Sequence, residues 1–169
     1  METTIILNKE HENILKVIAS VERECTALQS GKEIDSEYFT KAIDFIRNYA
    51  DKFHHAKEEE ILFKEFVSVS EKAHCNPVDQ MLHEHDMGRE FVKGMETAIT
   101  SGDKESLIEN ASSYAALLTD HIHKEDNILY PMTEQVISEE TQVEMLAKFK
   151  KVKLDEKYVV IIKEFEERK

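Results

Sequence analysis

Hydrophobic residues recur at every third or fourth position along most of this chain, the spacing of an amphipathic α-helix. There is no sustained alternation of Val, Ile and Thr that would indicate a β-strand. Gly31 suits a left-handed cap after the first helix, Pro77 suits the start of the third, and Pro131 is expected to kink or end the fourth. The predicted helices cover about residues 4–29, 36–69, 77–102, 103–131 and 138–167.

The short connections between the first four helices predict antiparallel neighbours, and hence an all-α, up-down-up-down four-helix bundle over residues 1–135. Residues 136–169 form an additional C-terminal amphipathic helix, expected to pack on the bundle or on a partner, which leaves oligomerisation open. Four glycines, two prolines and 34% charged residues agree with a helical protein, and 169 residues are enough for one hydrophobic core.

Charge, the N-terminal sequence and cysteine placement limit the partners, the location and the disulfide bonds that this protein is expected to have. A formal net charge of −13 argues against nucleic acid or an anionic membrane as a partner. The first nine residues lack a basic stretch followed by a long apolar run, so we expect no signal peptide, no transmembrane span and a cytoplasmic location. Cys25 and Cys75 are expected at opposite ends of the bundle, too far apart for an internal disulfide.

A polar motif occurs twice immediately before an apolar stretch. His54 and Glu58 stand four residues apart, on one helix face, and Ile61-Leu62-Phe63 follows; His121 and Glu125 repeat the spacing before Ile128-Leu129-Tyr130. Burying an imidazole and a carboxylate is unfavourable unless they are paired or bind a metal ion. A smaller unit also occurs twice, as Glu10-His11-Glu12 and Glu84-His85-Asp86. The chain therefore reads as one two-helix unit used twice.

In an antiparallel bundle these positions lie at the same end and at nearly the same height. Four imidazoles and two carboxylates suit iron, zinc, copper or manganese better than calcium or magnesium. Six ligands are too many for one tetrahedral zinc ion, and they suit two ions bridged by Glu58 and Glu125. We expect His83 and His123 to point outward. His55 could neighbour the ligands, but we favour a place at the surface or its boundary. The predicted metal ligands are His11, His54, Glu58, His85, His121 and Glu125.

These motifs resemble the hemerythrin-like domains, specifically the branch described as HHE cation-binding. The resemblance covers about residues 5–135. It implies a four-helix bundle with a non-haem di-iron site, oxo- or hydroxo-bridged, held by the six residues above, with zinc or manganese as alternatives. The chain is also similar to the metal-binding half of the iron–sulfur-cluster-repair di-iron proteins.

One position departs from the oxygen-carrying members of that family. They have two histidines one turn apart on the third helix, whereas Met81 and Arg89 stand one turn either side of His85 here. The missing imidazole implies one more open coordination position. Asp126, five residues after His121, matches the oxygen carriers' spacing and is the alternative to Glu125, which the internal repeat favours. Gly88 provides either room for a ligand or close helix packing.

The expected function is that of a di-iron protein that binds a small diatomic molecule or peroxide (O2, NO or H2O2). Two alternatives remain open. One is an iron donor or iron–sulfur-cluster-repair protein, whose acidic surface would meet a basic acceptor protein. The other is an oxygen or iron sensor without turnover. The sequence does not decide whether the protein is an enzyme.

Overall fold

The computed structural model describes residues 1–73 and 75–168, and regular structure in these ranges is helical throughout. The predicted all-helical class is therefore confirmed. The α-helices are α1 (Glu2–Gln29), α2 (Ser36–Phe45), α3 (Phe63–Ser68), α4 (Val78–Ser101), α5 (Lys104–Lys124), α6 (Tyr130–Val136), α7 (Glu139–Phe149) and α8 (Lys157–Glu167). The π-helical segments are η1 (Ile46–His55), η2 (Glu58–Leu62) and η4 (Glu125–Leu129), and η3 (Ser70–Lys72) is a 3-10 turn.

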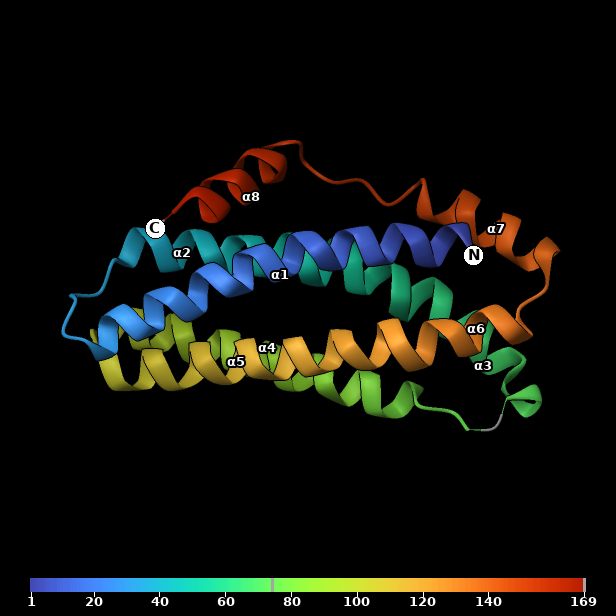
Figure 1. Cartoon of the computed structure of the whole chain (residues 1–169), viewed down its shortest axis with the longest axis horizontal. Helices are drawn as coiled ribbons and strands as arrows, with labels where there is room; N and C mark the ends of the chain where they lie inside the picture. The colour runs from blue at the N-terminus through green and yellow to red at the C-terminus, as the bar shows by residue number, and fades with distance from the viewer. Residues whose placement is uncertain (74, 169) are drawn as a thin grey trace.

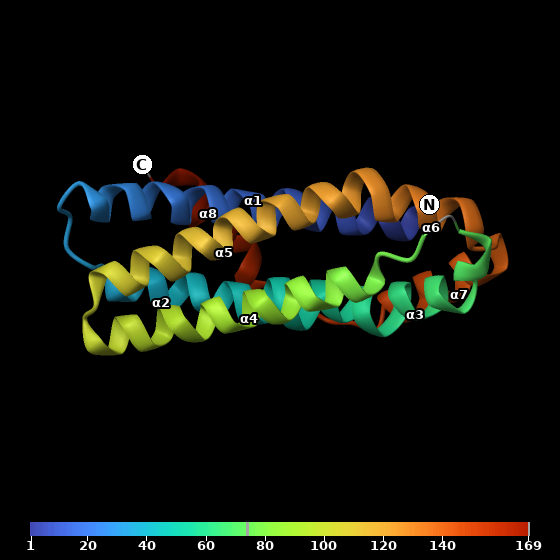
Figure 2. The ribbon, with the colours of Figure 1, turned by 90° about the horizontal axis from the view of Figure 1, so that it is seen from below.

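The helices assemble into an elongated bundle (Figures 1 and 2). Two of its long rods are the single helices α1 and α4. Another is the continuous segment from α2 through η1 and η2 to α3, and another is the segment from α5 through η4 to α6. Helix α5 packs against both α1 and α4, and α2 packs against α4. No helix in the described ranges is both long and apolar enough to cross a membrane.

Local capping sets where the long helices begin and end. The side chains of Asp35 and Asp103 accept hydrogen bonds from backbone N–H groups at the starts of α2 and α5, at 3.0 and 3.1 Å. After α1, Gly31 adopts the predicted left-handed conformation with φ +101°, and the Lys32 N–H bonds the Ala27 carbonyl at 3.0 Å. These caps are sequence-local, which explains why the predicted bounds of α1 and the predicted start of α5 agree closely with the observed ones.

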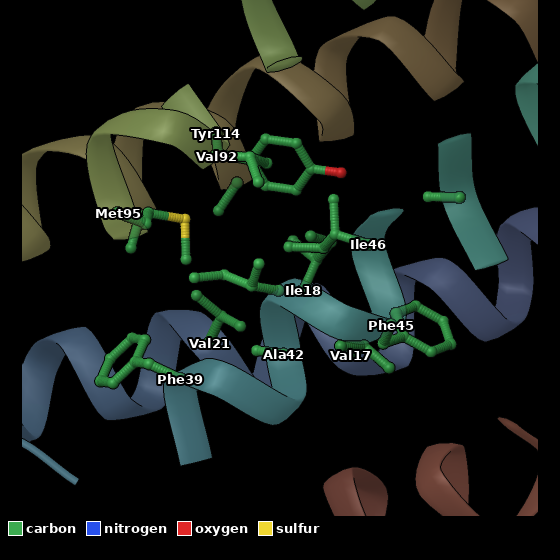
Figure 3. Packing of buried hydrophobic residues seen from close by; sticks show 14 of the residues in the cluster. Val17, Ile18, Val21, Phe39, Ala42, Phe45, Ile46, Val92, Met95 and Tyr114 are labelled. Carbon is green, nitrogen blue, oxygen red and sulfur yellow. The ribbon is translucent and has the colours of Figure 1, made fainter. Parts of the chain in front are cut away.

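The apolar interior is divided into two clusters. Figure 3 shows the larger one, where Val17 and Ile18 of α1 meet Ile46, Val92 and Tyr114 of the neighbouring rods. The smaller cluster lies at the end that holds the N-terminus. Along every rod, histidines or glutamates separate the positions of one cluster from those of the other. The smaller cluster contains Leu7, Ile61, Leu62, Phe63, Phe66, Val78, Met81, Leu129, Tyr130, Ile137, Met145 and Phe149.

The structure corrects two expectations about helix ends. Of the two outcomes expected at Pro131, a kink or the end of the fourth helix, the end does not occur, because the π-helical turn η4 precedes Pro131 and this residue falls in the first turn of α6, where a missing N–H is tolerated. The C-terminal region is two helices rather than one. Phe149 and Tyr158 are nine residues apart, so on one continuous helix they would face nearly opposite directions. The break between α7 and α8 lets Phe149 join the smaller cluster and Tyr158 the larger.

Candidate metal centre

The layer between the two clusters contains all six side chains predicted as ligands. His11 comes from α1, His54 from η1, His85 from α4 and His121 from α5, while Glu58 and Glu125 are the first residues of the π-helical segments η2 and η4. Each of the six is at most 2% exposed. π-Helical turns inside α-helices are frequent at functional sites. Their occurrence at the same place in both halves extends the repeat seen in the sequence.

Each of the two carboxylates lies between two imidazoles from different rods. Glu58 Oε2 is 3.6 Å from both His54 Nε2 and His85 Nε2. Glu125 Oε2 is 3.3 Å from both His11 Nε2 and His121 Nε2. Two groups of side chains in the layer could each hold an ion, because the ligand atoms within each group lie within 4.8 Å of one another. One group is His11, His54, Glu58 and Glu125, and the other is His55, Glu58, His85 and His121. Both groups contain Glu58, so the arrangement can accommodate two adjacent ions.

The outward nitrogens of the four histidines are held by a second ring of carboxylates. The Nδ1 atoms hydrogen-bond a carboxylate at 2.7 to 2.9 Å in every case. Such a bond fixes the tautomer, directs Nε2 inward and raises its basicity as a metal ligand. The pairs are His11 with Asp126, His54 with Glu10, His85 with Glu59, and His121 with Glu84.

Two lysines complete this outer ring, and the sequence reasoning missed them. Lys57 is only 2% exposed, donates to Glu10, and places its ammonium 3.4 Å from the centre of the Phe53 ring. Lys124 donates to Glu84 at 2.5 Å. A signal was present, because a lysine immediately precedes the glutamate in both His-x-x-x-Glu motifs and a glutamate precedes both lone histidines.

Three carboxylate oxygens at the centre of the layer have no hydrogen-bond partner among the described residues. They are Glu58 Oε2 and both oxygens of Glu125. The other Glu58 oxygen accepts the Tyr130 hydroxyl at 2.5 Å. A buried polar atom without a partner is destabilising by about 1–3 kcal/mol, more if it is charged. Metal ions would satisfy these oxygens and the inward Nε2 atoms together, so the residues present fit a metal centre.

Comparison with known protein families gives a match over most of the chain. The sequence model described as the hemerythrin HHE cation binding domain matches residues 3–133. The chain belongs to the hemerythrin family. The comparisons with curated proteins and with solved structures gave no match. The family description, cation binding, agrees with the buried groups of histidine and glutamate in this hemerythrin domain, which could hold metal ions.

Without metal, the two central carboxylates of the hemerythrin domain differ in charge. Burial raises the pKa of Glu58 well above its usual value, and the neighbouring Glu125 raises it further. Burial also acts to raise the pKa of Glu125, but His121 and His11 hold it well below its usual value. Although burial opposes it, contact with Asp126 and Glu125 raises the pKa of His11 to about 9. Without metal, the layer therefore favours the protonated form of Glu58 and a charged His11–Glu125 pair.

Metal binding to this hemerythrin domain is accordingly expected to release protons and to tighten as pH rises. Below about pH 9, His11 carries a proton that must leave before its nitrogen can bind a cation. Each displaced proton strengthens apparent affinity by up to about tenfold per pH unit, and the His11 contribution levels off above its pKa. Titration calorimetry in two buffers of different ionisation enthalpy measures this release, and identical heats in both buffers at pH 7 would contradict it.

Three histidines remain within the described residues, and His74, expected in a loop, lies outside them. His83 and His123 are exposed, as predicted. His55 was predicted at the surface or its boundary, and that prediction was wrong. It is buried, and its ring stacks on His85 with ring centres 3.7 Å apart. His55 lies about 100° around the helix from His54, so its environment depends on how closely α4 approaches, which the sequence of this rod does not reveal.

Glu125 and Asp126 occupy different places in the hemerythrin domain. Glu125 is completely buried at the centre, whereas the side chain of Asp126 is 33% exposed and contacts the outward nitrogen of His11.

Gly88 lies against the Tyr114 ring, because a Cβ atom there would be 3.4 Å from the ring edge. It also lines a cavity of about 580 Å³ that extends to His55, His85 and His121.

Proposed function

We propose that this chain is a non-haem di-iron protein that binds O2, NO or peroxide at its four-histidine, two-glutamate layer. Glu58 and Glu125 would bridge the ions and His11, His54, His85 and His121 would be terminal ligands. The observation that carries the proposal is the set of carboxylate oxygens that have no hydrogen-bond partner among the residues described and are surrounded by four inward-directed Nε2 atoms. We further propose up-down-up-down connectivity for residues 1–135, with residues 136–169 packed on this bundle.

Iron is the metal that best combines this ligand set with the small molecules proposed. Imidazole-rich sites bind zinc, copper and iron well, so ligand type alone does not choose among them. When bound, an iron pair would supply redox capacity and open coordination positions for a diatomic molecule or peroxide. Oxygen carriers have a second histidine one turn from the first on this helix, whereas Met81 and Arg89 stand one turn either side of His85 here, and the Arg89 guanidinium pairs with Asp51 and Glu59 instead of facing the layer. Fewer imidazoles leave more open positions.

The protein's own residues supply orientation, exclusion of water and access. The two apolar clusters enclose the layer on both sides. The cavity beside His85 and His121 gives a small molecule a route to them. The buried Tyr114 hydroxyl, visible in Figure 3 above Ile46, has no partner in the described part of the chain, and Tyr114 is one of the residues that line that cavity. It can donate a hydrogen bond to an incoming oxygen or nitrogen atom.

The proposal is tested by loading metal-free protein with Fe²⁺ under anaerobic conditions, removing excess iron, and recording the spectrum before and after adding NO, azide with air, or peroxide. We expect about two iron ions per chain and a new near-ultraviolet or visible band on exposure. Glu58→Ala should lose both, because it removes the carboxylate shared by the two groups. His83→Ala, which changes an exposed histidine, is the matched control and should retain both.

Other results would contradict the proposal or redirect it. A single zinc ion per chain with no bound iron would overturn it. Two iron ions without any spectral response to these molecules would instead favour a sensor or a structural role. Rapid transfer of iron to a metal-free acceptor protein would favour the iron-donor alternative.

A further inference from the structure

A third group of metal-ligating side chains lies between the buried layer and solvent. Asp51, His55 and Glu59 each offer one ligand atom, and these atoms lie within 4.8 Å of one another. The three residues are spaced four apart on one helical rod, so they share a face. The side chains of Asp51 and Glu59 are 29% and 22% exposed, and His55 beneath them is buried.

His55 connects this outer group with the inner layer. Its Nδ1 atom is buried without a hydrogen-bond partner in the described structure and lies 3.5 Å from Asp51 Oδ1, so it faces the outer group. The same residue belongs to the inner group with Glu58, His85 and His121. The outer group and this inner group therefore share one side chain, His55, through which an ion could pass from one to the other.

In this structure the positively charged guanidinium of Arg89 binds the two carboxylates of the outer group. Its guanidinium donates to Asp51 Oδ1 at 2.7 and 3.0 Å and to Glu59 Oε1 at 2.7 Å. It also donates to the exposed Asp86 at 2.8 Å, one turn away on its own helix. The Arg89 side chain is 34% exposed, so it can move toward Asp86 and solvent without disrupting the core. The cavity that reaches His85 and His121 is also lined by Asp51, His55 and Arg89.

We propose that Asp51, His55 and Glu59 form a loading site that captures Fe²⁺ from solvent and passes it through His55 to the inner layer, with Arg89 holding the site when no ion is present. The inference rests on the proposed function, because the inner layer must accept metal ions. The two carboxylates attract the hydrated cation, and the imidazole selects a transition metal over calcium or magnesium. Asp86 receives the displaced guanidinium.

A purely structural role for these contacts makes a different prediction. Glu59 also accepts the Nδ1–H of His85, so Arg89 could serve only to hold Glu59 in place. In that case, removing Arg89 would loosen His85 and weaken or slow metal binding. If Arg89 instead competes with the incoming ion, removing it speeds uptake. The sign of the Arg89 effect separates the two roles.

The test measures uptake rate and final stoichiometry separately. Metal-free protein is mixed with Co²⁺ in a stopped-flow instrument and followed by visible absorption, and the experiment is repeated with anaerobic Fe²⁺ using rapid removal of free metal. Asp51→Asn should slow uptake on the order of tenfold, with unchanged final content, since it removes an attracting charge and a ligand outside the inner layer. Arg89→Gln should load faster than the unmodified protein.

The matched control is Glu96→Gln. Glu96 pairs with Arg47, which makes it the carboxylate of another ion pair between η1 and α4, and the substitution changes net charge as Asp51→Asn does. It should load at the unmodified rate. Uptake by Asp51→Asn at the unmodified rate, or slower uptake by Arg89→Gln, would overturn the loading site. An unmodified protein that binds no ion at all would instead overturn the proposed function.

Discussion

Glu125→Ala is expected to reduce iron content from about two ions per chain to one or none, whereas Asp126→Asn should retain both ions with weaker affinity. Glu125 is completely buried and its Oε2 lies equally close to His11 and His121, so removing it takes away a ligand shared by both sides of the layer. Asp126 contacts the outward nitrogen of His11, and loss of such a contact typically weakens metal affinity 10–100-fold.

Metal analysis after gel filtration, followed by competition with a chelator, measures both effects. Circular dichroism of each variant verifies that its helical content is unchanged. The reverse outcome would be full iron content in Glu125→Ala and loss of iron in Asp126→Asn. It would identify Asp126, rather than Glu125, as the carboxylate of the α5–η4–α6 rod that binds the metal. It would also contradict the inward and outward roles inferred for this pair.

Metal binding is expected to raise the unfolding temperature by more than about 10 °C. Free metal at a thousand times its dissociation constant stabilises the folded state by about 4 kcal/mol per site, and each kcal/mol shifts the midpoint of a chain this size by about 2–4 °C. The physical cause is the buried layer, in which three carboxylate oxygens have no hydrogen-bond partner within residues 1–73 and 75–168 and would be satisfied by a cation.

Glu58→Gln should remove this metal-dependent increase while leaving the metal-free midpoint nearly unchanged. Its pKa is raised well above the usual value by burial and by Glu125, which favours the neutral acid in the metal-free protein, and an amide is a close replacement for that form. Calorimetry with anaerobic Fe²⁺ and with chelator provides the comparison, and Glu12→Gln, at an exposed position beside His11, is the control. Equal midpoints with and without metal in the unmodified protein would show that the layer does not bind metal.

Local sequence patterns are enough to predict the helical rods and the depth of the six polar positions along them. Both depend on local regularities: a period of 3.6 residues selects the buried face, and spacing from caps such as Gly31 and Asp103 sets height along a rod. His54 and Glu58 share a face however the rods are arranged, because four residues make about one helical turn. The prediction that they lie with His121 and Glu125 needed only antiparallel neighbours.

Tertiary structure alone decided the contacts that cross between rods. Asp126 reaches His11 and Glu59 reaches His85, and no spacing within one helix specifies such a pair. Lys57 and His55 are buried for the same reason, because a position at the edge of a helix face is exposed or covered according to how closely the next rod approaches. The break between α7 and α8 also follows from packing, since Phe149 and Tyr158 must bury against different clusters and a continuous helix would turn them apart.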